Sequence, residues 1–166
     1  MHTIDFVAQD RRQPLLVSVE GVDDQSWPES PPLQQLDPLK PAENRSAVLL
    51  VGMAGTSHWS LSAEAQASSG EIAFDVACRL HESPTWLGSR YRLAEGVSPI
   101  RDSSNQAIEL ELPSGSCWLS MDRLVSKGPL ELCDRHLAAR PEVRFPAELP
   151  ATVRWRYTIR DRCHSR

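Results

Sequence analysis

The sequence predicts an all-β protein, either a single antiparallel β-sandwich or a partly closed β-barrel, with one proline-rich connection between its strands. Three observations predict this class. Apolar and polar residues alternate with a period of two along most of the chain, and no long segment has helical periodicity. Clusters of Gly, Pro and Ser separate strand-sized segments by roughly 8–12 residues. A length of 166 residues fits one domain over residues 1–166.

The first predicted elements are two N-terminal strands and a proline-rich arm. Thr3–Val7 and Leu15–Glu20 alternate in polarity and are joined by a polar turn. Residues 27–44 then contain five prolines. Proline fixes φ and lacks an amide donor, so this segment cannot form a central strand or a helix interior. We expect a loop or arm that crosses the surface.

The rest of the chain continues as short strands. Alternation predicts them over Ala47–Met53, the hairpin His58–Leu80, Trp86–Leu93, Ala107–Leu112, Cys117–Val125, Leu130–Cys133 and Thr152–Arg160. Residues 97–105 have the composition of a turn, and residues 130–140 allow one short turn of helix. Residues 161–166 form a basic tail.

The hairpin His58–Leu80 has a predictable register. Its two sets of alternating apolar residues must face one core, which requires the numbers of paired residues to have an odd sum. A sum of 137 leaves a four-residue turn over 67–70 and places Trp59 opposite Cys78. A sum of 135 would oppose Glu64 to Glu71, which is unfavourable. We therefore predict the pairing with a sum of 137.

The polar face of this hairpin is the first candidate site. It carries His58, Ser60, Ser62, Asp75 and Arg79. A catalytic triad needs a nucleophile bonded to a base and the base bonded to an acid. The predicted register places Ser62 opposite Asp75 but His58 opposite Arg79, and two residues along a strand span about 6.8 Å. We therefore favour a binding face over a hydrolase that would use Ser62, Asp75 and His58, and we predict no catalytic residue.

Two small residues interrupt the charges of that face. Ala73 and Ala77 flank Asp75 on the second strand of the hairpin. Small side chains at these positions leave room for another layer, a partner or a ligand. A segment of the same chain is the most common cover for such a face, and we expect it to be the proline-rich arm, residues 27–44.

The last strand carries the second candidate site. Residues 135–166 contain eight arginines against three acidic residues. Arg154, Arg156 and Arg160 lie on the face opposite to the aromatic residues, so rings and cations cannot grip one nucleic-acid strand together. We predict that these arginines pair with Glu109 and Glu111 on a neighbouring strand. The alternatives are a charged protein interface and a site for an anionic polymer.

A third aromatic and basic cluster lies in residues 86–93. Gly88 interrupts this strand-like segment, which predicts a bulge or a close approach of the backbone. Trp86, Arg90 and Tyr91 could line a sugar or peptide site. We favour a bulged strand whose aromatic side chains pack inward.

Composition excludes several classes of site and places the protein in a compartment. The four cysteines form no CxxC pair, which predicts free thiols and no metal site. No glycine-rich phosphate loop is present, so we expect no cofactor. No stretch approaches the ~18 apolar residues of a membrane helix. The first residues, MHTIDFVAQDRRQP, contain charges where a signal peptide has an apolar core. We expect a cytoplasmic protein without membrane contact.

Three stretches, HWSLSAEA, FDVACRL and WLGSRYRL, resemble parts of uncharacterised β-rich bacterial proteins of unknown function. The resemblance spans residues 58–93 at most. It implies no catalytic residue, cofactor or substrate.

These observations favour a binding or protein-interaction module, with another protein or a second copy of the chain as its partner and without nucleic acid. A second hypothesis is a barrel that carries a small apolar ligand, with Trp59, Phe74 and Trp155 inside. A third is the anionic-polymer site on the last strand.

Overall fold

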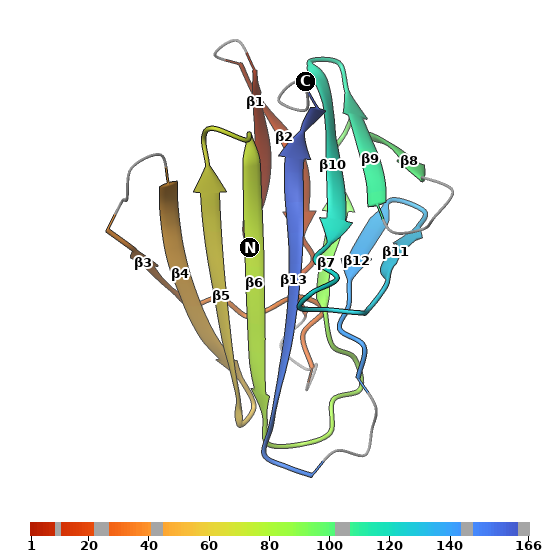
Figure 1. Cartoon of the computed structure of the whole chain (residues 1–166). Helices are drawn as coiled ribbons and strands as arrows, with labels where there is room; N and C mark the ends of the chain where they lie inside the picture. Colours follow the sequence, from red (N-terminus) through yellow and green to blue (C-terminus); the bar gives the residue numbers. More distant parts are fainter. Residues whose placement is uncertain (9–10, 22–26, 41–44, 102–106, 144–147, 163–166) are drawn as a thin grey trace.

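Two antiparallel β-sheets pack face to face in this protein, as Figure 1 shows. The structure is a computed structural model that describes residues 1–8, 11–21, 27–40, 45–101, 107–143 and 148–162. The described residues contain strands and no helix, and the sheets do not close into a barrel. The all-β class is therefore confirmed, and the architecture is that of a β-sandwich.

The two sheets differ in size. The small sheet has the order β1-β2-β7-β12-β11 and consists of β1 Thr3–Ala8, β2 Arg11–Ser18, β7 Ser89–Leu93, β12 His136–Ala139 and β11 Leu130–Cys133. The large sheet has the order β3-β4-β5-β6-β13-β10-β9-β8 and consists of β3 Gln35–Pro38, β4 Arg45–Ala54, β5 Ser57–Gln66, β6 Glu71–Leu80, β13 Ala151–Asp161, β10 Gly115–Met121, β9 Ala107–Leu112 and β8 Ser98–Arg101.

The predicted register of the β5–β6 hairpin is confirmed. Trp59 pairs with Cys78, Ser62 with Asp75, and the turn spans 67–70. Gly70 closes this turn with a φ of 58°, a conformation that costs glycine little. One face of the hairpin is therefore in the core and the other faces outward.

Aromatic residues in the core form hydrogen bonds that link the two sheets. Trp155 of β13 donates its indole N–H to Ser89 of β7 over 3.1 Å. Tyr91 of β7 and Tyr157 of β13 share a hydrogen bond of 2.5 Å between their hydroxyls. Both tyrosines are fully buried, and burial raises the pKa of Tyr157 to about 12. The aromatic rings thus fill the core without leaving these polar atoms unpaired.

The proline-rich arm runs along the inner side of the sandwich. Trp27 packs on Trp59 with ring centroids 6.3 Å apart. The carbonyl oxygen of Pro32 lies so close to Gly52 that a Cβ there would be 1.5 Å from it. The arm then forms edge strand β3, which agrees with its exclusion from central positions. The expectation that the arm covers the polar face of the β5–β6 hairpin is wrong, because Trp27 and Pro32 contact the inner face and β3 only extends the edge of the sheet beside β4.

Two local predictions are also corrected. Residues 130–140 form the hairpin β11–β12 instead of a helical turn, with Asp134 at a φ of 52° in its connection. β12 pairs with β7, and this tertiary contact overrides the weak helical pattern. The segment 97–105, predicted as a turn, contains edge strand β8. The basic tail lies outside the described residues except for residues 161 and 162.

Within the described ranges, no helix has the length and apolar character needed to cross a membrane.

Candidate functional site

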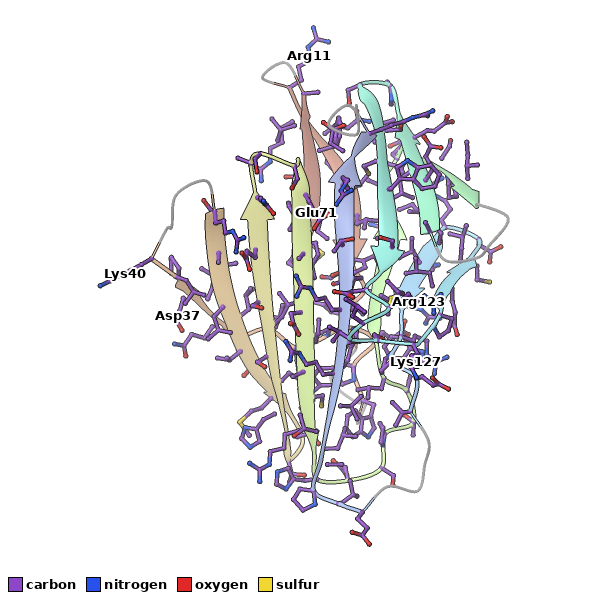
Figure 2. The ribbon with its side chains drawn as sticks, in the orientation of Figure 1. Arg11, Asp37, Lys40, Glu71, Arg123 and Lys127 are labelled. Atoms are coloured by element: carbon purple, nitrogen blue, oxygen red, sulfur yellow. The ribbon has the colours of Figure 1, made fainter. Side chains whose placement is uncertain are left out.

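Four of the eight predicted site residues, Asp75, Arg154, Arg156 and Arg160, form charge pairs on the outer face of the large sheet. Arg154 donates to Asp75 over 2.6 Å, and Arg160 donates to Glu71 over 2.5 Å. Figure 2 shows Glu71 at one end of β6. These pairs link β13 to its neighbour β6. The side chains of both arginines are more than half exposed, so the pairs fix register more than they add stability.

The partner predicted for these arginines is wrong. β10 lies between β13 and β9, so Glu109 and Glu111 do not face the arginines of β13 directly. Glu109 instead accepts a hydrogen bond from Arg162 over 2.7 Å. Arg156 lies 3.5 Å from Asp122, which follows β10. The arginines are paired within the chain, as expected. Their partners are Asp75 and Glu71 on the neighbouring strand β6 and Asp122 after β10.

The triad residues occupy the positions that the register requires. Ser62 lies opposite Asp75, and His58 lies opposite Arg79. Asp75 is held by Arg154, and the ring of His58 contacts His81 at a centroid distance of 6.0 Å. The structure therefore brings the serine and the carboxylate together and leaves the histidine at the far end of the face.

Small residues do open hollows in this outer face. A hollow of about 560 Å³ includes Ser60, Ala77, His58 and Arg79 in its lining. A second hollow, of about 260 Å³, lies over Ala73 and between charged side chains. The smaller hollow is lined mainly by polar surface, so water competes well for the contacts that a ligand would make there.

The Trp86 cluster lies on the small sheet. Arg90 and Arg140 place their guanidinium groups 5.7 and 5.6 Å from the Trp86 ring centre. A Cβ at Gly88 would lie 2.9 Å from the carbonyl oxygen of Ala139, so the close backbone approach predicted there is present. Both arginines also pair with glutamates, and Tyr91 is fully buried. The cluster is thus a packed cation–π stack.

The described residues contain no group of three His, Cys, Asp or Glu side chains that could hold a metal. Cys78 and Cys117 are buried free thiols, and Cys133 is an exposed one. Burial raises the pKa of Cys78 and Cys117 to about 12, which keeps them as unreactive thiols. Cys163 lies outside the described residues.

A feature that sequence analysis missed is an apolar cleft at the open edge of the sandwich, between β1 and the inner face of β4, β5 and β6. Figure 1 shows β3 and β4 extending beyond the small sheet. Exposure increases toward this edge: Trp155 of β13 is fully buried, Leu61 of β5 is 3% exposed, and Leu36 of β3 is 56% exposed. The eight-stranded sheet thus presents apolar side chains that the five-stranded sheet does not cover.

The cleft arises because β1 crosses the large sheet obliquely. The start of β1 lines the same space as Leu61 of β5 and Phe74 of β6. Further along β1, the ring of Phe6 lies 3.2 Å from the point that a Cβ on Gly115 of β10 would occupy. Two cavities, of about 500 and 340 Å³, follow the resulting gap. They share the lining residues Ile4, Asp5, Ser46, Ala65 and Ile72. We call this continuous space the edge cleft.

A series of hydrogen-bonded side chains leads from the core to one end of the edge cleft. His2 lines the cleft, and its Nε2 lies 3.2 Å from the hydroxyl of Tyr91. That hydroxyl continues to Tyr157. Burial lowers the pKa of His2 to about 4, so the imidazole is neutral at physiological pH. The apolar cleft therefore contains a neutral hydrogen-bonding group at one end.

Of the three aromatic residues proposed to line a ligand cavity, only Phe74 lines the edge cleft. Trp59 and Trp155 pack edge to face in the core, with ring centroids 6.0 Å apart. The alternation of Ile4 and Phe6 on β1 and the apolar run that contains Val48 and Leu50 of β4 are visible in the sequence. Only the strand order reveals that these two apolar faces meet at an open edge.

No family model, no curated protein and no solved structure matches this chain.

Proposed function

We propose that the protein is a binding module, not an enzyme, and that it takes an elongated apolar ligand into the edge cleft. The observation that carries this proposal is the pair of joined cavities, of about 500 and 340 Å³, beside a fully packed core. Binding sites for apolar ligands are largely preformed concave spaces of this size with few polar groups.

The lining supports a largely apolar ligand with polar groups toward its ends. Ile4, Ile72 and Phe74 supply apolar surface, His2 supplies a hydrogen-bonding group at the smaller cavity, and charged residues line the larger one (Asp5, Arg45, Glu71 and Asp161).

The hollows of the outer face are less suitable, although one of them is larger. The larger hollow contains the charged Arg79 in its lining, which an apolar ligand would separate from water. In the smaller hollow, Arg45 and Arg156 are already paired with Glu64 and Asp122, and a ligand would have to replace those bonds.

The test is binding of the apolar fluorescent probe N-phenylnaphthylamine. We expect saturable binding to the wild type and, for Ala65→Phe, an affinity about tenfold lower, because the ring occupies the space that both cavities share. Ser60→Phe is the matched control, since Ser60 lies on the same strand and lines the outer hollow. Equal binding by the wild type and Ala65→Phe would refute the proposal.

A further inference from the structure

The edge strand that borders the cleft is unlike the other edge strands. Among the described strands, β1 pairs only with β2, so one side of its backbone is free. β3 and β8 are edges of four residues that contain Pro38 and Pro99, and β11 is an edge of four residues. Proteins protect edges by shortening them or by adding proline or lysine. β1 is longer, with six residues, TIDFVA, and contains neither proline nor lysine; its irregularities are a register shift against β2 between Ile4 and Asp5 and the charge of Asp5, which pairs with Arg12.

The free side of β1 carries backbone groups that point into the gap above β4 and β5. The carbonyl of His2 accepts a hydrogen bond from the amide of Ser18 on β2 over 2.9 Å. The carbonyl and the next amide of a planar trans peptide point in opposite directions. The amide of Thr3 therefore points away from β2, toward the free edge.

The floor of the cleft has room for another layer. Ser46, Ala63 and Ala65 contribute small side chains to the inner face of β4 and β5. Packed sheets lie about 10 Å apart, and neighbouring strands about 4.8 Å apart. A strand added to β1 at this spacing would continue the small sheet over β4 and β5. Its inward side chains would fill the cavity space above those small residues.

We propose that the ligand of the edge cleft is an extended polypeptide segment of another protein, apolar at alternate positions, that adds to β1 as a further strand of the small sheet. This inference rests on the proposed function and names the class of its ligand. Strand addition combines backbone hydrogen bonds along an edge with pockets for alternate side chains, and the edge cleft supplies both.

Two other occupants fit the edge less well. A lipid chain would fill the cavity but leave the edge amides of β1 without partners in an apolar space, which is costly. A second copy that paired through its own β1 would bring two large sheets together. Each large sheet extends past β1 by β3 and β4, so the two overhangs would meet before the edges paired.

The test uses fluorescence anisotropy with the labelled peptide acetyl-Lys-Val-Thr-Val-Thr-Val-Lys-amide and the full chain. Successive residues of a strand direct their N–H groups to opposite edges, so the valines of this peptide share one edge and the threonines share the other. One methylated form carries N-methyl groups on two valines, and the other carries them on both threonines. We expect the unmethylated peptide to bind, one methylated form to bind at least about tenfold more weakly, and the other to bind nearly as well.

Substitution at Thr3 tests the same edge from the protein side. Thr3→Pro removes the outward amide while the bond between His2 and Ser18 is retained. We expect the peptide affinity of Thr3→Pro to be about tenfold lower than that of the wild type. Thr3→Val keeps the amide and is the matched control. If Thr3→Pro fails to fold, the two methylated peptides still decide the question.

The outcomes separate this inference from the proposed function. If the probe binds but the peptide does not, or if both methylated forms bind equally well, strand addition is wrong and the apolar site stands. If the probe also fails to bind, both proposals fall. Peptide binding that Ala65→Phe leaves unchanged would also overturn strand addition, because the inward side chains would then not enter the cleft.

Discussion

The two halves of this sandwich show what a facing sheet contributes to the same pattern of residues. In the closed half, β6 and β13 place alternate apolar side chains under β2 and β7, and Val76, Trp155 and Tyr157 are fully buried. In the open half, β4 contains the continuous apolar run Ala47–Val51, and Val48 and Leu50 on its inner face are only half-buried. Both halves thus have apolar side chains on the inner face of the large sheet, and the difference in burial is the presence of a second layer.

This difference assigns different roles to the two halves. Aromatic residues of the closed half are bonded to each other and to the opposite sheet, so few side-chain arrangements satisfy them. The open half has small residues, a free strand edge and cavity space. We infer that the closed half sustains the fold while the open half is available to a ligand.

The largest expected effect is the loss of a large side chain from the closed half. Trp155 is fully buried, packs on Trp59 and donates to Ser89. We expect Trp155→Ala to lower the free energy of unfolding by about 3–5 kcal/mol, because it leaves a cavity and removes the hydrogen bond to Ser89. Urea unfolding followed by circular dichroism measures this change. A loss below about 1 kcal/mol would mean that the closed half is not the stabilising half.

The β5–β6 hairpin, which spans both halves, was the part that sequence could predict best. Strict alternation fixes which residues of the β5–β6 hairpin face inward, and unfavourable charge pairs eliminate its competing register. Both arguments depend only on neighbours within a hairpin. They therefore held without knowledge of the rest of the fold.

The edge cleft and the arginine partners depend on strands that are far apart in sequence. β13 lies beside β6 and β10, and alternation within β13 contains no information about that order. Glu109 is the right type of partner for an arginine and bonds to Arg162 instead of the arginines predicted. The overhang of β4 follows from the difference in strand number between the sheets, which no single segment records.

The second effect is a loss of stability in acid that arises at the boundary between the halves. Burial holds the pKa of His2 at about 4, below its ordinary value of 6.5. Above pH 6.5 the imidazole is neutral in both the folded and unfolded states, so it imposes no penalty. As the pH falls from 6.5 to 4, the unfolded chain binds a proton that the folded chain excludes, and stability is lost.

We expect this loss to approach about 3 kcal/mol across that interval, which is the free-energy equivalent of the shift in the His2 pKa. His2→Gln does not titrate there and is the control for all other acid effects. The measurement is the free energy of unfolding of both proteins at pH 7.5 and pH 4. Parallel pH profiles for the two proteins would show that His2 is not buried as described.

The third effect compares two leucines that are neighbours across β4 and β5. Leu61 is 3% exposed, whereas its partner Leu50 is half-buried at the open edge. We expect Leu61→Ala to cost about 2–4 kcal/mol and Leu50→Ala about 1 kcal/mol in unfolding free energy, because less cover means less apolar area lost. Equal costs for the two substitutions would show that the open half is covered in solution. Adding the strand peptide should not lower the cost of Leu50→Ala.

The smallest effect concerns the outer face, where Asp75 and Arg154 form an exposed cross-strand pair. A double-mutant cycle with Asp75→Ala and Arg154→Ala should give a coupling energy of about 0.2–1 kcal/mol, since solvent screens both charges and ordering the arginine has an entropic cost. Raising the salt concentration should reduce the coupling further. A coupling above about 2 kcal/mol that ignores salt would mean that another molecule or layer covers this face. In that case the outer face, and not the edge cleft, would be the surface that binds a partner. The important difference would then lie between the two faces of the large sheet instead of between its closed and open halves.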